Sequence, residues 1–487
     1  MRLLSELLTQ AKLDATVQGD AAVTITAMTT DSRQVTPGGL FAAMPGVSAD
    51  GAQYIAEAVR RGASAILLAN DAVCEAAVPL VRVADMRAAV SALAAAFYAA
   101  QPAFAFAITG TDGKTSTADF VRQLGNLLGH QAASLGTLGL RSPVAALDAA
   151  FPAMNTSPEP VLLHQTLRAL SEAGVDMVAI ETSSHGLDQK RPDGVRFCAG
   201  AFTNMTRDHL DYHGSLDAYF TAKARLFSAV LPEGATAVLN HDDAHYDTLR
   251  RICDARRMVV VSFGAHADAT YRVLSVTPHA GGLDAQLDIR GVHYTLKLPL
   301  YGAFQLSNML SAMGLLSAMG VKEAAVMALL PQLRGVPGRL EKIASHNDAP
   351  VFIDYAHTPA ALENILKTLR PHTQKKLHVV FGCGGDRDAG KRPEMGAAAV
   401  AYADAVIVTD DNPRSENPAA IRAAILARAS GATEIGDRDE AIRAAVKNLQ
   451  AGDVLVVAGK GHETTQTIGK HVLPFNDADH IRKAVAA

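Results

Sequence analysis

A glycine-rich turn gives the clearest chemical signal in the sequence. Residues 108–116 read Ile-Thr-Gly-Thr-Asp-Gly-Lys-Thr-Ser, so an apolar strand runs into a turn with two glycines and then into a helix opened by Lys114 and Thr115. Such a turn lets backbone N–H groups approach phosphate oxygens, Lys114 neutralises phosphate charge, and the Thr115 hydroxyl can ligate Mg²⁺. A full Walker A pattern would have glycine at Ile108, so a chance match has to be weighed. The strand-turn-helix context favours ATP binding.

Polar side chains also follow two later apolar strands. Glu181 comes directly after the apolar run 175–180, and a carboxylate in a neighbouring strand can reach a Mg²⁺ ion held at the phosphate turn. Ser183 belongs to a run of small polar groups that are costly to bury without ligands. The stretch 203–211 supplies His209 and two carboxylates. Taken singly, a turn cap or a solvated loop would also explain these residues.

The elements that must position these side chains follow an α/β pattern. The first hundred residues mix short strands and helical stretches. From residue 103 onward, helical segments alternate with apolar strands, as in a mostly parallel sheet covered on both faces. These strands are predicted at 104–108, 175–180, 197–202, 235–240 and 258–263. Between 271 and 300 the polarity alternates and breaks at two glycine-containing pairs, which predicts an antiparallel meander.

The alternation of strands and helices restarts after Gly335-Val336-Pro337-Gly338. Four further strands each end in a polar or glycine-rich string: DYAHTP, GCGGDRD, TDDNPR and AGKGHE. In open parallel α/β sheets ligands bind at the carboxyl ends of the strands, so these four strings are expected to share one crevice.

Two breaks in the pattern divide the chain into three domains. Gln101-Pro102 separates an Ala-rich helix from the strand that follows, because proline cannot continue a helix. We therefore predict an N-terminal α/β domain over 1–101, a central P-loop-type ATPase domain with a parallel sheet and a meander over 102–335, and a Rossmann-like domain over 336–487. Hinge motion is expected near residues 101 and 336.

Composition excludes several classes of protein. The 487 residues are 49% hydrophobic and 19% charged, which is typical of globular chains and excludes disorder. The 45 Lys and Arg against 49 Asp and Glu give a net charge of −4, so no broad basic surface for nucleic acid or anionic lipid is expected. The four cysteines are far apart and are predicted to be buried thiols. With no membrane insertion and no signal peptide expected, the predicted location is cytoplasmic.

Ten motifs, in order along the chain, resemble those of the Mur ligases of peptidoglycan precursor synthesis. The N-terminal string TDSRQVTPGGLFAAMPG is similar to that family as well, so the resemblance covers all three predicted domains. The ten motifs are GTDGKTS, ETSSHGLDQKR, TNMTRDHLDYHG, YFTAKARLF, YGAFQLSN, GVPGRLE, DYAHTP, GCGGDRDAGKRP, DDNPRSENP and AGKGHE.

The resemblance implies an ATP-dependent ligase that makes an amide. In this family ATP phosphorylates a substrate carboxylate, and an amine attacks the acyl phosphate, releasing ADP and phosphate. Phosphate leaves readily where hydroxide or oxide would not, and Mg²⁺, Lys114 and helix dipoles stabilise the negative charges that meet. Water must be excluded from the acyl phosphate, and closure of three domains would exclude it.

The resemblance also implies a carbamate. Lys223 matches a family lysine that reacts with CO₂ and then ligates a second Mg²⁺, with Glu181 and His209 completing the metal site and Thr115 holding metal at the phosphates. A carbamate offers the anionic oxygens that a hard cation prefers, whereas an ammonium would repel it. The resemblance therefore implies that the catalytic residues of this chain are Lys114, Glu181, His209 and Lys223.

Further residues are assigned by the same matching. ATP is expected to contact Gly110, Thr111, Asp112, Gly113, Lys114, Thr115 and Ser116, with Asn308, Arg339 and Asp354 at its adenine and ribose. The UDP-N-acetylmuramoyl-L-Ala-D-Glu substrate is expected to contact Thr30, Ser32, Val47, Ser48 and Ala49 at its uridine end. At its other end the matching residues are Asn155, Thr156, Ser157, Ser183, Gln189 and Arg191, and the guanidinium of Arg191 is suited to bidentate pairing.

The amino-acid acceptor implied is meso-diaminopimelate. Asp411-Asn412-Pro413-Arg414 is the string of family members that use it, and lysine-adding members lack this arginine. Arg414 would pair with the distal carboxylate and repel the ammonium of lysine. Arg387, Gly459 and Glu463 match the other acceptor contacts. A turn with a solvated arginine remains the alternative for this string.

Some residues depart from the family pattern, and other functions compete. Asp112 stands where Asn is usual and brings negative charge close to phosphates; Ser116, Ser157 and Gln305 are polar replacements that keep hydrogen-bonding ability.

The competing enzymes are a lysine-adding or D-Ala-D-Ala-adding ligase and a folylpolyglutamate synthase. A non-catalytic nucleotide-binding scaffold is the alternative from another class. The partners expected are small molecules, and a monomer is expected.

Overall fold

The computed structural model describes residues 1–45, 50–152 and 155–487. The chain forms two compact units, the first comprising residues 1–263 and 311–326 and the second comprising 264–310 and 327–487. The mixed α/β class and the mostly parallel sheets predicted from the sequence are confirmed.

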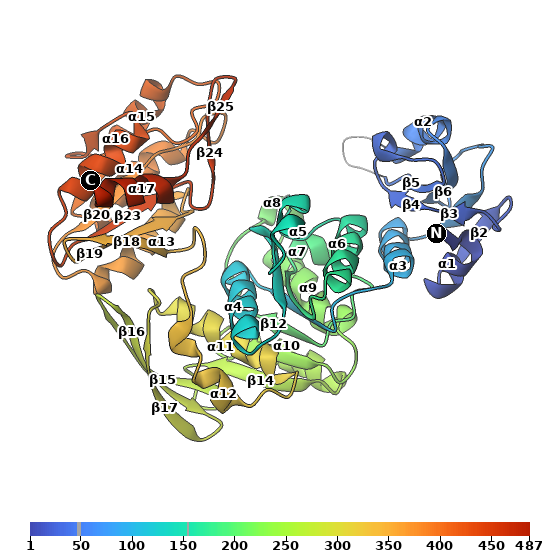
Figure 1. Cartoon of the computed structure of the whole chain (residues 1–487), viewed down its shortest axis with the longest axis horizontal. Coiled ribbons are helices and arrows are strands. Elements are labelled where there is room, and N and C mark those ends of the chain that lie inside the picture. Colours follow the sequence, from blue (N-terminus) through green and yellow to red (C-terminus); the bar gives the residue numbers. More distant parts are fainter. Residues whose placement is uncertain (46–49, 153–154) are drawn as a thin grey trace. The chain divides into compact units, whose positions relative to one another are not determined.

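The N-terminal part of the first unit is a small α/β layer (Figure 1). Its five-stranded sheet is parallel except for the edge strand β2 and has the order β2 (Ala15–Gln18), β7 (Leu80–Val83), β6 (Ala63–Ala69), β5 (Gly39–Ala42) and β4 (Ala27–Thr29). Strands β1 (Arg2–Leu3) and β3 (Thr24–Ile25) pair separately. The helices are α1 (Leu4–Gln10), α2 (Ile55–Arg60) and α3 (Met86–Tyr98). Asp85 caps α3 by accepting from Ala88 N, and the helix ends before Pro102 as predicted.

A larger sheet follows, and α3 packs beside its helix α6 (Figure 1). Within the first unit the strand order is β10 (Gly139–Arg141), β9 (Ala132–Gly136), β11 (Met177–Glu181), β8 (Phe104–Thr109), β12 (Ala199–Phe202), β13 (Thr236–Asn240) and β14 (Val259–Gly264), parallel except for β10. Nearly all residues of the inner strands β11, β8 and β12 are buried, as a sheet covered on both faces requires. The helices are α4 (Lys114–Leu127), α5 (Ala145–Ala150), α6 (Pro160–Glu172), α7 (Ser184–Asp188), α8 (Leu210–His213), α9 (Leu216–Arg225) and α10 (Tyr246–Ala255).

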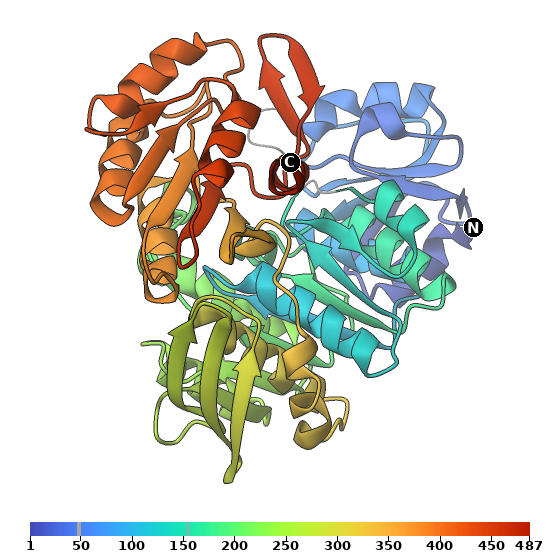
Figure 2. The same ribbon diagram turned by 60° about the vertical axis from the view of Figure 1, so that its left-hand side comes forward.

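The second unit begins with the predicted meander. Strands β15 (Tyr271–His279), β16 (Gly282–Ile289) and β17 (Val292–Leu298) pair antiparallel and lie side by side, olive to yellow in Figure 2. Helices α11 (Phe304–Ser317) and α12 (Glu323–Met327) follow, each with residues in both units.

The C-terminal sheet has helices on both faces. Its order is β18 (Glu341–His346), β19 (Ala349–Asp354), β23 (Val454–Ala458), β20 (Leu377–Phe381), β21 (Ala405–Val408) and β22 (Thr433–Glu434), parallel except for β18. Along β20, Val379 packs with α13 (Pro359–Leu369), α14 (Lys391–Tyr402) and α15 (Pro418–Leu426). The next residue, Val380, packs with α16 (Arg438–Lys447) and α17 (Asp477–Ala486). This alternation is the two-residue period of a strand buried on both faces. The hairpin of β24 (Thr465–Ile468) and β25 (His471–Pro474) forms a sheet of its own.

Two remaining expectations concern thiols and membranes. All four cysteines are free; Cys253 and Cys383 are buried, whereas Cys74 and Cys198 are only half-buried, contrary to the prediction. Within the described residues, none of the helices is both long and apolar enough to cross a bilayer.

Candidate functional site

The predicted phosphate-binding turn lies between β8 and α4. Gly110 has a φ of +145°, and Gly113, with a φ of +82°, is the N-cap of α4. A Cβ atom at position 110 would lie 1.9 Å from Thr203 Oγ1, so only glycine fits there. Lys114 Nζ donates to the carbonyl oxygens of Gly110 at 3.0 Å and Thr111 at 2.7 Å, and Ser116 is buried in the first helical turn. The turn and the helix N-terminus together have the backbone arrangement that binding of a phosphate requires.

The loop after β12 holds this turn in place. Thr111 N donates to Asn204 O and Asp112 N donates to Asn204 Oδ1, both at 2.9 Å. Thr203 Oγ1 donates to Asp112 O at 2.6 Å. Asp112 itself is exposed, so water screens the carboxylate charge that departs from the family pattern.

Glu181 lies beside the turn because β11 pairs directly with β8, with Glu181 opposite Ile108. The carboxylate is buried and accepts from Thr115 Oγ1 at 3.0 Å, from Thr137 N at 2.9 Å and from Thr137 Oγ1 at 3.2 Å. A Cβ atom at Gly136 would lie 2.1 Å from Glu181 Oε1, so the glycine makes room for the carboxylate. The hydroxyl of Thr115 and the carboxylate of Glu181 are hard oxygen donors in contact, which suits Mg²⁺.

Lys223 approaches the same turn from α9. Its side chain is 1% exposed, and Nζ donates to Gly110 O at 2.6 Å and lies 4.3 Å from the ring centre of Tyr219. Burial, followed by the charge of Lys114, lowers the pKa of Lys223 to about 6. A large share of the amine is therefore neutral at pH 7, which is the form that reacts with CO₂.

His209 lies in a group of aromatic rings. It has a left-handed φ of +50°, and its ring is 4.8 Å from the ring of His185 and 6.0 Å from that of Tyr219. Burial, then the charges of His209 and His213, lowers the pKa of His185. Of the four predicted metal ligands, Thr115 and Glu181 are in contact, whereas Lys223 and His209 are each linked to Tyr219. The described residues contain no group of three His, Cys, Asp or Glu side chains that could hold a metal ion.

Four of the predicted stem-peptide residues, Ser157, Ser183, Gln189 and Arg191, are linked by hydrogen bonds. Ser157 Oγ lies 3.1 Å from Ser183 Oγ and accepts from Ser183 N at 2.8 Å. Arg191 donates to Ser157 O at 2.7 Å and to Gln189 Oε1, and it pairs with Glu159. Thr156 Oγ1 lies 3.2 Å from Thr137 Oγ1, which connects this group to Glu181. Asn155 lines a small cleft with Gly136.

The predicted uridine-side residues are only partly described. Thr30 follows β4, and Ser32 Oγ donates to Glu57 Oε2 at 3.3 Å. The predicted contacts Val47, Ser48 and Ala49 lie outside the described residues.

The predicted adenine-side residues belong to the second unit. Asn308 Nδ2 donates to Gln305 Oε1 at 3.1 Å, so the polar replacement at 305 keeps a hydrogen bond. Asp354 accepts from Leu340 N at 2.7 Å and Ala356 N at 2.8 Å, and burial raises the pKa of this carboxyl group. The guanidinium of Arg339 lies 5.4 Å from the ring centre of Tyr355, and its Nε is buried without a hydrogen-bond partner among the described residues.

The predicted acceptor residues gather at the carboxyl ends of β20, β21 and β23. Asn412 Nδ2 donates to Glu463 Oε2 at 2.9 Å, and Arg414 Nη1 donates to Gly385 O at 2.8 Å. Burial raises the pKa of Asp411, and a Cβ atom at Gly459 would lie 2.7 Å from Asp411 Oδ2. Pro413 is buried, whereas Arg387 is exposed. The fourth string, DYAHTP, lies beside them, because Gly459 N donates to Asp354 O at 3.1 Å and the ring of Tyr355 is 5.4 Å from that of His462. All four predicted strand-end strings therefore meet at this edge of the sheet.

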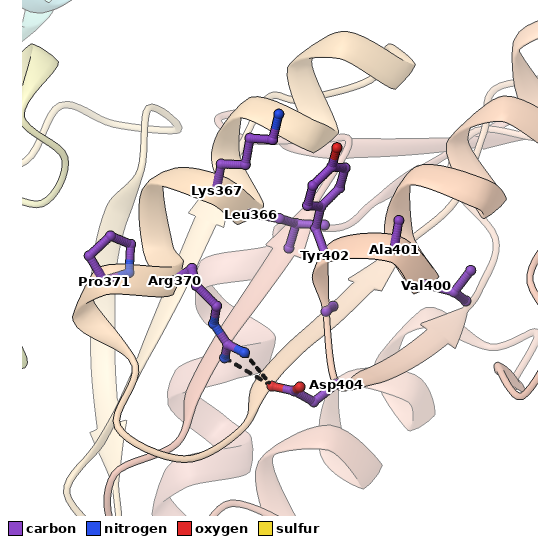
Figure 3. Close-up of a pocket in the computed structure, with 9 residues that line it drawn as sticks. Leu366, Lys367, Arg370, Pro371, Val400, Ala401, Tyr402 and Asp404 are labelled. Atoms are coloured by element: carbon purple, nitrogen blue, oxygen red, sulfur yellow. Dashed lines mark hydrogen bonds and ion pairs between the residues drawn. The ribbon is translucent and has the colours of Figure 1, made fainter.

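A separate pocket of about 420 Å³ lies between α13 and α14 (Figure 3). Arg370 points at Asp404 across it, and the two terminal guanidinium nitrogens, Nη1 and Nη2, each donate to Asp404 Oδ2 at 2.9 Å. Lys367 on its rim pairs with Glu363. The charged side chains that line it are thus already paired, and none of the predicted site residues lines it.

Sequence reasoning missed several residues that hold the site. Thr137 and Asn204 support Glu181 and the phosphate turn, and Tyr219 OH lies 3.1 Å from Thr111 Oγ1. Lys460 contacts Asn412 and Glu463. Lys460, Tyr219 and Asn204 all lie within the motifs AGKGHE, YFTAKARLF and TNMTRDHLDYHG, so the motifs contained the signal but no individual role had been assigned.

Comparison with known proteins identifies the family of the chain. Three family models match: "Mur ligase family, catalytic domain" at residues 24–98, "Mur ligase middle domain" at 108–316 and "Mur ligase, glutamate ligase domain" at 338–461. Two curated relatives are each named UDP-N-acetylmuramoyl-L-alanyl-D-glutamate--2,6-diaminopimelate ligase. The protein of Mesorhizobium japonicum is 48% identical over 96% of this chain and 97% of its own length. That of Caulobacter vibrioides is 48% identical over 95% of both chains.

A solved structure with the same ligase name is 32% identical, with a TM-score of 0.72, and the match covers 95% of both chains. The chain therefore belongs to the Mur ligase family.

Proposed function

We propose that this chain is the ATP-dependent ligase that joins meso-diaminopimelate to the D-Glu carboxylate of UDP-N-acetylmuramoyl-L-Ala-D-Glu, a step of peptidoglycan precursor synthesis. The relatives that share 48% of its residues carry the name of a ligase acting on this dipeptide and 2,6-diaminopimelate. The observation that carries the proposal for this chain is the acceptor site, where the backbone of Thr467 bonds both Arg414 N and Asn412 Oδ1, and Asn412 Nδ2 donates to Glu463.

The nucleotide half of the reaction is assigned to the turn between β8 and α4. Backbone N–H groups of Gly110–Gly113, with Ser116 and the α4 N-terminus, bind the ATP phosphates, and Lys114 neutralises their charge. Thr115 and Glu181, whose oxygens are already in contact, hold Mg²⁺, which supplies charge neutralisation at the transferring phosphoryl group. Asn308, Arg339 and Asp354 hold the adenine and ribose.

Lys223 is assigned as a carbamate. Its amine is buried beside the phosphate turn, and the lowered pKa favours the neutral form. Attack of the neutral amine on CO₂ forms a C–N bond and releases one proton, which leaves an anionic oxygen ligand where the protonated lysine would be a repulsive cation. With Glu181 and His209 the carbamate would hold a second Mg²⁺, which supplies further charge stabilisation.

The dipeptide half is assigned to the network around Ser157 and Arg191. Arg191 provides a guanidinium for a carboxylate or phosphate of the substrate, and Asn155, Thr156, Ser183 and Gln189 provide neutral hydrogen bonds. Thr30, Ser32 and residues 47–49 contact the uridine end. The D-Glu carboxylate takes a phosphoryl group from ATP, and the acceptor amine then displaces phosphate to form the amide.

Arg414 distinguishes the acceptors. A guanidinium forms two parallel hydrogen bonds with a carboxylate and repels an ammonium, so it favours diaminopimelate over lysine. Arg387, Asp411, Asn412, Pro413, Gly459 and Glu463 complete the acceptor site. We assign residues 1–101 to the UDP substrate, 102–335 to ATP and 336–487 to the acceptor, with hinges near 101 and 336, in a cytoplasmic monomer.

The test is phosphate release by the purified protein with MgATP and UDP-N-acetylmuramoyl-L-Ala-D-Glu, with meso-diaminopimelate or L-lysine as acceptor. Turnover with diaminopimelate alone is expected. The variant Arg414→Ala should lose most of this preference, and Arg428→Ala, at an exposed arginine of the same domain, should keep it. A preference for lysine in the unaltered protein would refute the role of Arg414. Release with neither acceptor would refute the proposed function.

A further inference from the structure

Lys460 is a buried cation at the centre of the acceptor site. It follows β23 between Gly459 and Gly461, and it has no exposed surface. Its Nζ donates to Thr465 O at 2.7 Å, to Glu463 Oε2 at 3.0 Å and to Asn412 Oδ1 at 3.2 Å. A lysine ammonium has three N–H donors, so these three acceptors satisfy it completely. The side chain therefore acts on its neighbours and has no donor left for a ligand.

These contacts fix the orientation of Asn412. Its Oδ1 accepts from both Lys460 Nζ and the backbone N–H of Thr467, the latter at 2.9 Å. The amide nitrogen must then point the other way, and Nδ2 donates to Glu463 Oε2. Glu463 receives both of its hydrogen bonds on the same oxygen and is one-third exposed, so its carboxylate is held in one orientation and still faces solvent.

The same lysine is tied to the backbone that carries Arg414. Lys460 binds Thr465 O, at the start of β24. Two residues later, Thr467 O accepts from Arg414 N at 3.0 Å, and Gly469 N donates to Arg414 O at 2.7 Å. Arg414 has a left-handed φ of +51°, which these two hydrogen bonds hold. One buried cation thus connects the carboxylate of Glu463 to the strand that positions the guanidinium of Arg414.

The charges around Lys460 differ at the two ends of the site. Behind it, Arg438 and Asp477 form a fully buried pair, and Arg438 also donates to Ala458 O. The charges of this pair cancel. The remaining charged groups around Lys460 are the two carboxyl groups of Asp411 and Glu463 and the one ammonium group of Lys460 itself. The Glu463 end therefore suits an ammonium group, whereas the Arg414 end suits a carboxylate.

We propose that Lys460 is a positioning residue that fixes Glu463 and Arg414 relative to each other and so selects an acceptor with an ammonium at one end and a second carboxylate at the other. The inference rests on the proposed function, because it concerns how that acceptor is recognised. Lys460 acts through Asn412, Glu463 and β24 without touching the acceptor.

The test compares Lys460→Met, Lys460→Arg and the matched control Lys447→Met, at an exposed lysine of α16, in the full-length enzyme. Initial rates give the KM for meso-diaminopimelate, ATP and the UDP-dipeptide, and the ratio of kcat/KM for diaminopimelate to that for lysine. For Lys460→Met we expect about a tenfold or larger rise in KM for diaminopimelate and a similar fall in the ratio, with the other two KM values within about twofold. Lys460→Arg, which keeps the charge, should recover part of the loss.

Several outcomes overturn the proposal. One is a folded Lys460→Met enzyme in which the KM for diaminopimelate and the ratio of kcat/KM values are unchanged. Another is an equal rise in KM for all three substrates, which would indicate a merely structural role. If Lys460→Met does not fold, Lys460→Gln replaces it, because the amide keeps N–H donors but removes the charge and should give the same selective change. Absence of turnover in the unaltered enzyme would refute the proposed function and this inference together, whereas normal turnover with a silent Lys460→Met would refute the inference alone.

Discussion

The hydroxyl of Thr115 donates to Glu181 Oε2 over 3.0 Å, which joins the first turn of α4 to the end of the neighbouring strand β11. The contact exists because β11 and β8 are adjacent and parallel, so the residues that follow them emerge at one edge of the sheet. Two hard oxygen donors held together by the sheet are prepared for a cation without rearrangement of the backbone.

Glu181→Gln should abolish most activity without unfolding the protein. The amide has the size of the carboxylate and keeps one acceptor for Thr137 N, but it loses the charge that a divalent cation requires. We expect kcat/KM for MgATP to fall by about a hundredfold or more and the thermal midpoint to change little. Rates measured over a range of Mg²⁺ concentrations check this. Glu172→Gln, at an exposed carboxylate paired with Arg168, is the control and should behave as the unaltered enzyme.

Lys223→Ala should lose activity and regain part of it when formate or acetate is added. Truncating a fully buried lysine leaves space in which a short carboxylate can replace the carbamate oxygens. The recovery is measured as phosphate release with and without the added carboxylate at about 0.1 M. The same salts should not stimulate the unaltered enzyme or Lys483→Ala, at an exposed lysine. Full activity of Lys223→Ala without any addition would contradict the carbamate.

Comparison of Gly110→Ala with Gly129→Ala should separate the effect of a steric clash on ATP binding from the effect of backbone strain. Both glycines have positive φ angles, +145° and +92°. A Cβ atom at 110 would meet Thr203 Oγ1 at 1.9 Å, whereas a Cβ atom at 129 would meet no atom of the described residues within 4 Å. Gly129→Ala should therefore cost only about 1 kcal/mol in the free energy of unfolding and leave ATP binding intact. Gly110→Ala should weaken ATP binding by about tenfold or more, because the turn cannot keep its shape. Equal ATP affinities of the two variants, measured by titration, would count against the assigned cradle.

Much of the architecture was predictable because buried strands are apolar and continuous. The strand adjacency that brings Glu181 to the phosphate turn follows from the general rule that parallel α/β sheets gather their ligands at one edge. The burial of Lys460 was not predictable in this way. A lysine between two glycines has the composition of an exposed turn, and it is buried only because the β24 strand returns over it from residues 465–468.

The support of the phosphate turn was equally hidden in the sequence. Tyr219 reaches Thr111 across 108 residues, and the hydrogen bond depends on how α9 packs, which the spacing of apolar residues does not specify. His209 adopts a left-handed backbone conformation that residues other than glycine seldom adopt. Local propensity favours neither feature; both require the packed tertiary structure.

His164 should make the stability of the protein depend on pH. It is buried in α6, with Nε2 3.3 Å from Asp193 O, and burial lowers its pKa from 6.5 to about 4. Above pH 6.5 the imidazole is neutral in both the folded and the unfolded chain, so its contribution to stability is complete there. As the pH falls from 6.5 to 4, the unfolded chain takes up a proton that the folded chain does not, and the free energy of unfolding decreases. Because each pKa unit is worth about 1.4 kcal/mol, the full loss is about 3 kcal/mol.

Urea unfolding at pH 7 and pH 5, compared between the unaltered protein and His164→Gln, isolates this contribution from those of the other histidines. The glutamine does not titrate, so the variant should lose less stability than the unaltered protein between the two pH values, by about 2 kcal/mol. His293→Gln, at an exposed histidine, should leave the pH dependence as it is. Parallel losses in the unaltered protein and His164→Gln would mean that the buried imidazole accepts its proton within the folded structure. The packing of α6 would then have to open at that pH, since a charged imidazole without a second acceptor is costly to bury.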